Sequence, residues 1–131
     1  MKNMLLLSLL LDSITANADW SKAMNSTTNG PNFYVDLDKI NKKGSFVKMW
    51  SMNDYQQPKL GPNNAAYSSM KTYNEYDCSL RTIRLLAAVI SKGNMGTGDI
   101  VYSNMTPSSE SEPIVPESQG EYMWQLACGK K

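Results

Sequence analysis

Histidine is absent from this chain, so cysteine and aspartate are the residue types that could most readily take part in catalysis or bind a metal. Without histidine, the chain lacks the commonest general base and the commonest metal ligand. The only cysteines are Cys78 and Cys128. Asp36 and Asp38 are close neighbours in the sequence, and a pair of carboxylates can perform acid–base catalysis when their surroundings separate their pKa values.

A structural role explains the two aspartates more simply than catalysis does. Asp side chains commonly bond to the backbone of a turn, and no other residues complete a catalytic site around this pair. A calcium loop would also require a glycine and a distal glutamate that are missing here. The sequence therefore predicts a protein that is not an enzyme, with no metal site and no cofactor.

The first residues predict export. Lys2 supplies a positive charge, residues 4–11 form a short apolar core, and Ala16 and Ala18 provide the small side chains that a signal peptidase requires. The alternative interpretation is a buried N-terminal helix. We predict a signal peptide at residues 1–18 and a single domain at residues 19–131. In an oxidising compartment the two cysteines are expected to form one disulfide.

Charge and hydropathy exclude several classes of partner. The formal net charge is +1, whereas a general nucleic-acid-binding domain is normally strongly basic. The apolar core at residues 4–11 is shorter than the ~20 residues that a membrane-spanning helix requires, and no later segment is apolar enough to be a second membrane element. The sequence therefore predicts neither a nucleic-acid partner nor a membrane span.

The residue pattern after the leader alternates between short strands and turns. Residues 33–35 and 45–52 favour a hairpin, because a turn rich in Asp, Asn, Lys and Gly separates them. Further strands are expected at residues 67–76 and 99–104, with loops or turns at residues 53–64, 93–98 and 106–119. A C-terminal helix is expected at residues 120–128, with Ser118 as its cap and Glu121 in its first turn.

Three features of this pattern have competing interpretations. Residues 78–91 have apolar residues at both helical and strand spacing, so periodicity alone does not decide between them. Residues 96–98 (Gly-Thr-Gly) resemble part of a phosphate-binding loop, but a hairpin turn is favoured because a strand follows. Trp50 and Trp124 are expected in the core, while Trp20 lies in a polar segment and could be exposed.

The densest group of basic residues comes from the first predicted hairpin. Its members are Lys39, Lys42, Lys43 and Lys48. They could form a solvated face that protects a strand edge from aggregation. They could instead form a basic patch that binds acidic glycans or proteins, and we take them as the candidate binding residues.

The order of several short motifs resembles the bacterial surface-adhesin protein E family. The resemblance rests on residues 33–36, Ile40, Gly44, residues 47–50 and 53–55, Tyr76-Asp77-Cys78, Arg84, residues 94–98 with 100–101, Pro116, Ser118, residues 120–121, Trp124 and Cys128. It covers nearly all of the predicted mature chain, and both cysteines match the family's pair.

The resemblance implies an α+β fold, with a small antiparallel β-sheet, a short C-terminal helix packed on it and one disulfide. It favours a long strand from about residue 76 to residue 91. It also implies an exported, non-enzymatic binding module that contacts host or matrix proteins or glycans. The alternative is a periplasmic accessory protein of the cell envelope with a protein partner. A homodimer and either location, periplasm or cell surface, remain open.

Overall fold

The computed structural model describes residues 20–24 and 30–129. Within these ranges the chain forms eight strands and one α-helix. The strands are β1 (Ser21–Met24), β2 (Asn32–Val35), β3 (Asn41–Lys43), β4 (Phe46–Leu60), β5 (Ala66–Asp77), β6 (Thr82–Ser91), β7 (Ile100–Asn104) and β8 (Glu112–Pro113), and the helix is α1 (Gln119–Cys128). The predicted signal peptide lies outside the described residues.

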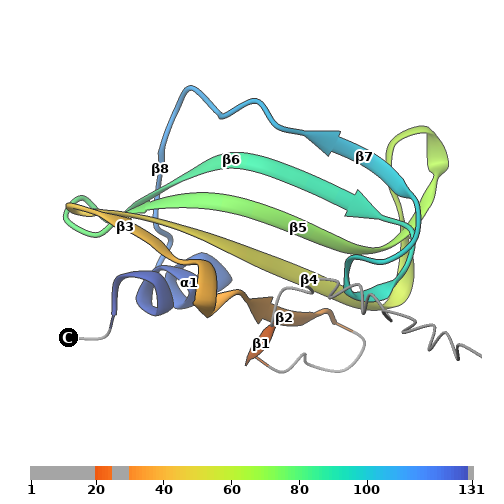
Figure 1. Cartoon of the computed structure of the whole chain (residues 1–131), viewed down its shortest axis with the longest axis horizontal. Coiled ribbons are helices and arrows are strands. Elements are labelled where there is room, and N and C mark those ends of the chain that lie inside the picture. Colours follow the sequence, from red (N-terminus) through yellow and green to blue (C-terminus); the bar gives the residue numbers. More distant parts are fainter. Residues whose placement is uncertain (1–19, 25–29, 130–131) are drawn as a thin grey trace, which may run out of the picture.

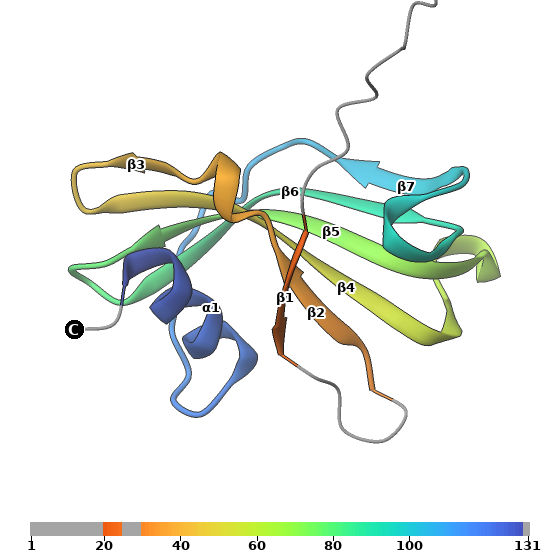
Figure 2. The ribbon, with the colours of Figure 1, turned by 60° about the horizontal axis from the view of Figure 1, so that its bottom comes forward.

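All strand pairs are antiparallel, in the order β1-β2-β4-β5-β6-β7, with β3 pairing β4 and β8 pairing β6. The long strands β4, β5 and β6 form the centre of the sheet (Figure 1). The helix α1 lies against one face, beside the β1–β2 pair (Figure 2), and the Tyr122 hydroxyl donates a hydrogen bond to the Ala23 carbonyl at 2.6 Å. The α+β class with a short C-terminal helix is therefore confirmed.

The hydrophobic core lies between α1 and the sheet. Val35, Met49, Tyr76 and Met123 are its buried members. Val35 comes from β2, Met49 from β4 and Tyr76 from β5, and alternation along each strand places these side chains on the same face. Met123 of α1 covers them, and Trp124 packs against the same cluster, as predicted.

The prediction of a loop at residues 53–64 is wrong over most of this range, because β4 continues to Leu60. Asp54 pairs with Ser69, whereas Lys59 already pairs with Tyr67, so the register shifts between these two pairs. Pro58 lies inside this irregular stretch, where proline does not interrupt a regular ladder. Proline was therefore a misleading signal for a loop.

The strand that the resemblance favoured is confirmed over residues 82–91, but it begins at Thr82 and not near residue 76. Asp77 ends β5, and its Oδ1 accepts hydrogen bonds from the backbone N–H groups of Leu80 and Ser79 and from the Ser79 hydroxyl. These bonds lower the pKa of Asp77, the Leu80 N–H most. The carboxylate thereby fixes a tight turn between two strands.

An irregularity in β6 explains its ambiguous periodicity. Tyr73 pairs with Ala87 while the next residue, Asn74, pairs with Leu85, so Leu86 is an extra residue in the ladder. A bulge of this kind resets the alternation of side chains between the two faces. Apolar residues on either side of Leu86 therefore do not follow a single strand period.

The disulfide is present and joins the β5–β6 turn to the end of α1. Cys78 and Cys128 lie 50 positions apart, with their Cα atoms 5.6 Å from one another. The indole N–H of Trp124 donates to the Asp77 carbonyl at 3.0 Å, and the Arg81 guanidinium lies over the Trp124 ring, 4.3 Å from its centre. We call this junction of the β5–β6 turn with α1 the C-terminal clamp.

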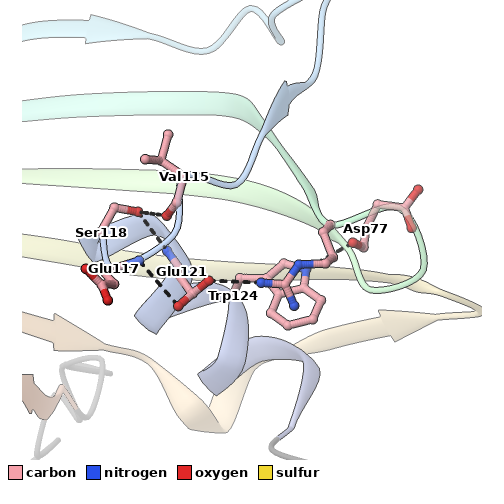
Figure 3. A network of polar contacts seen from close by, with 7 residues as sticks. Asp77, Val115, Glu117, Ser118, Glu121 and Trp124 are labelled. Carbon is pink, nitrogen blue, oxygen red and sulfur yellow. Dashed lines mark hydrogen bonds and ion pairs between the residues drawn. The ribbon is translucent and has the colours of Figure 1, made fainter.

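The start of α1 belongs to the same network (Figure 3). The Ser118 hydroxyl accepts a hydrogen bond from the Glu121 N–H at 3.2 Å and donates to the Val115 carbonyl at 2.6 Å. Ser118 is therefore the helix cap that the sequence predicted. Glu121 accepts from the Glu117 N–H at 3.4 Å and pairs with Arg81 at 2.9 Å, so it links the cap to the β5–β6 turn.

Candidate functional surface

The sheet face opposite α1 is the candidate functional surface, and we call it the distal face. Trp50 of β4 and Tyr73 of β5 are direct cross-strand neighbours there, and their rings stack with centres 4.9 Å apart. Glu75 of β5 lies opposite Arg84 of β6, and the two form an ion pair at 3.3 Å. The distal face thus presents aromatic and charged groups and also buries Met52 of β4 beside Trp50, while the other face supplies the core cluster under α1.

The structure divides the four predicted binding lysines between the two faces. Lys43 pairs with Phe46 and Lys42 with Val47. Since Val47 is buried and shares a face with Met49, Lys42 projects on the side of α1. Along β4, Phe46 and Lys48 point to the opposite face from Val47 and Met49. Lys48, and Lys43 as the cross-strand partner of Phe46, therefore lie on the distal side. The β3–β4 hairpin therefore carries three of these lysines on its two faces, and Lys39 precedes it, so the four do not form one patch.

Each group of lysines borders a different hollow of the surface. Lys43 and Lys48 line a cavity of about 430 Å³ together with Phe46 and Glu75. Lys42 lines a second cavity, of about 410 Å³, beside the C-terminal clamp. Lys39, from the short 3-10 helix η1 (Leu37–Lys39), lines a third cavity of about 180 Å³.

The third cavity contains residues that sequence reasoning did not bring together. Trp20, Asp36, Trp50, Lys71 and Val89 line it with Lys39. Trp50, expected in the core, is half-buried here on the distal face. Asp36 is 1% exposed, whereas Asp38 is exposed. The two aspartates that the sequence pairs therefore have different environments.

The Gly-Thr-Gly segment forms a turn, as expected. The 3-10 helix η3 (Asn94–Gly96) precedes β7. The Met95 N–H donates to the Asp54 carboxylate at 2.7 Å, and the Gly96 N–H donates to the Ser69 hydroxyl at 2.9 Å. Because side chains of the same chain occupy these N–H groups, the turn offers no cradle for a phosphate.

Among residues 20–24 and 30–129, no group of three or more Asp, Glu, Cys or His side chains is arranged to hold a metal ion. The same ranges contain no helix that is both long and apolar enough to cross a bilayer. Both cysteines are in the disulfide.

Comparison with known proteins assigns the chain to a family. The family model of the surface-adhesin protein E matches residues 20–129, so the chain belongs to this family. No curated protein sequence matches it.

Solved structures of protein E from Haemophilus influenzae have a similar fold. One has a TM-score of 0.63 at 12% identity, covering 86% of this chain and 85% of that chain. A second crystal form has a TM-score of 0.61 at 12% identity, covering 83% and 94%. Protein E from non-typeable Haemophilus influenzae has a TM-score of 0.58 at 13% identity, covering 86% and 85%. At this identity the likeness extends to the fold alone.

Proposed function

We propose that this protein is an exported, non-enzymatic binding domain that contacts an anionic partner through the lysines of η1, β3 and β4. Its membership of a surface-adhesin family supports a role in adhesion. The disulfide supports export, because such bonds persist in oxidising compartments. The partner is a glycan or protein of the host surface or matrix that carries negative charge.

The observation that carries this proposal is the exposure of unpaired lysines. Lys39, Lys42 and Lys43 are exposed and Lys48 is half-buried. Within the described ranges, none of them forms an ion pair with a carboxylate of this chain. Their charges are therefore available to attract an anionic surface from solution, which raises the rate of association more than the affinity.

The test measures association of the exported protein with immobilised heparin, used as an anionic glycan. Triple replacement of Lys39, Lys42 and Lys43 by Ala should slow association at low salt, and the difference should shrink as salt shortens the screening length to about 10 Å at 0.1 M. The matched control replaces Lys22, Lys59 and Lys92, which are also exposed. Equal slowing by both triples would show a net-charge effect and would contradict the proposed surface.

A periplasmic accessory role with a protein partner is the second candidate. The edge strand β7 favours it, because Ile100 and Tyr102 there are 64% and 42% exposed and an unpaired edge can add a strand from another chain. Protease added to intact cells separates the two candidates. Removal of the protein would support surface adhesion, whereas protection would support the periplasmic role.

A further inference from the structure

The cavity of about 180 Å³ on the distal face combines two indoles, two lysines and a buried carboxylate. We call it the indole cavity. Trp50, Lys71 and Val89 come from β4, β5 and β6, Asp36 follows β2 directly, and Trp20 precedes β1. The central strands of the sheet therefore hold half of its six lining residues in a fixed geometry, which is a property of preformed ligand sites.

The carboxylate of Asp36 is the most unusual group in this wall. Its backbone N–H donates to the Trp50 carbonyl at 3.1 Å, which fixes the residue against β4. Its Oδ1 is buried and, within the described structure, accepts no hydrogen bond. A buried acceptor without a donor is destabilising, and such groups are rare in folded proteins. Because Oδ1 is buried, a ligand in the cavity reaches the carboxylate only when the Asp36 side chain turns towards it, and a hydrogen bond from the ligand would then satisfy the group.

The lysines determine which kind of donor the cavity accepts. Neither Lys39 nor Lys71 forms an ion pair among the described residues, so they outnumber the single carboxylate of the cavity wall. The Lys71 side chain extends beside Gly96 of η3. A ligand ammonium would be repelled by these positive charges. A neutral hydroxyl donor attached to an anion would match both the carboxylate and the lysines.

The indoles determine the shape of the ligand. Tyr73 stacks on one side of the Trp50 ring, so a ligand can pack only against the other side or the edge of this ring. Val89 and Trp20 supply further apolar wall. A flat, partly apolar ring with polar groups at its rim fits these surfaces, and a pyranose sugar has this character.

We propose that the indole cavity binds an acidic sugar unit of the uronic acid class. The sugar ring packs against Trp50 and Trp20, a ring hydroxyl donates to Asp36, and the sugar carboxylate accepts hydrogen bonds from Lys39 or Lys71. This inference rests on the proposed function, because it names the glycan unit that an anionic partner would present at the distal face.

The test follows the three indole N–H signals of the exported protein by NMR during titration with glucuronic acid. Trp20 and Trp50 line the cavity, while Trp124 lies in the C-terminal clamp on the other side of the sheet and is an internal control. We expect the first two signals to shift and the third to remain. Glucose, which has the same ring without the carboxylate, should bind about tenfold more weakly, since it lacks a charge-assisted hydrogen bond.

Two variants and a control sharpen the test. The double variant Lys39→Gln with Lys71→Gln should reduce the affinity for glucuronic acid towards that for glucose, and Asp36→Asn should weaken both sugars. If Asp36→Asn does not fold, the double variant still decides, because Lys39 is exposed and Lys71 is half-buried on a regular strand. Lys59→Gln, which removes an exposed lysine whose ammonium lies over the Tyr55 ring, should leave both affinities unchanged.

The inference is overturned if glucuronic acid at about 50 mM, a concentration that would reveal millimolar affinity, moves neither the Trp20 nor the Trp50 signal. Equal binding of glucose and glucuronic acid would also overturn it. Heparin binding that persists in that case leaves the proposed function standing and removes the cavity alone. If heparin binding does not depend on the lysines but glucuronic acid still binds, the cavity stands and the proposed function is removed.

Discussion

The C-terminal clamp and the distal face differ in how completely their polar groups are satisfied. In the clamp, the Asp77 carboxylate accepts three hydrogen bonds, Trp124 has a partner for its N–H, and Arg81 contacts both Glu121 and the Trp124 ring. On the distal face, Oδ1 of Asp36 has no donor in the described residues. The clamp is therefore built for stability, while the distal face keeps interactions available for a partner.

The largest effect is expected from the disulfide of the clamp. Replacing both cysteines, Cys78→Ser with Cys128→Ser, releases a loop with a sequence separation of 50 residues. The chain-entropy model gives a loss of about 4 kcal/mol in the free energy of unfolding for a loop of this length. Urea denaturation measures it. An unchanged midpoint, or two free thiols in the exported wild-type protein, would contradict this prediction.

The second prediction concerns the buried phenol beneath the clamp. Burial raises the pKa of Tyr76 to about 12, against the opposing effect of a hydrogen bond with Asn74. Because the folded state holds the proton more tightly than the unfolded state, stability should be fully present below pH 10 and should fall as the pH rises towards 12. Two pKa units correspond to about 2.7 kcal/mol.

The variant Tyr76→Phe isolates this contribution, because it removes the ionisable hydroxyl and keeps the ring. The free energy of unfolding of the variant should fall less between pH 10 and 12 than that of the wild type. The exposed Tyr102 provides the matched control, and Tyr102→Phe should preserve the alkaline loss. If Tyr76→Phe loses as much stability as the wild type, other groups control the alkaline transition.

A smaller effect is expected at the helix cap. Ser118→Ala removes the acceptor for the Glu121 N–H, and the loss of such a cap lowers stability by about 1 kcal/mol. Ser111 is exposed and lies outside the helix, so Ser111→Ala is the control and should change little. Thermal melting of the two variants measures the difference, and equal melting temperatures would show that the cap contributes nothing.

The sequence predicted the clamp better than it predicted the distal face. Ser118, Glu121 and the two cysteines are recognisable from local spacing or from the count of cysteines. The helix and the disulfide were therefore expected correctly. These features depend on short-range rules, such as a cap that bonds to the N–H group three positions ahead.

The distal face depends on register, which local patterns do not supply. Lys42 and Lys43 are adjacent in the chain, yet strand alternation sends them to opposite faces. Asp36 and Lys71 are far apart in the sequence and reach one cavity through the pairing of β2, β4 and β5. The bulge at Leu86 further shifts the faces of β6. An irregularity of one residue is enough to defeat a prediction based on period alone.

The smallest effect on stability is expected on the distal face itself. Lys43→Ala with Lys48→Ala removes two charges that form no ion pair in the described chain, so the free energy of unfolding should change by less than about 0.5 kcal/mol. The same double variant should slow association with heparin, because both lysines line one cavity on this face. A fall of several kcal/mol would mean that these lysines support the fold through contacts of their stems, and the contrast between a stabilising clamp and an available distal face would then fail.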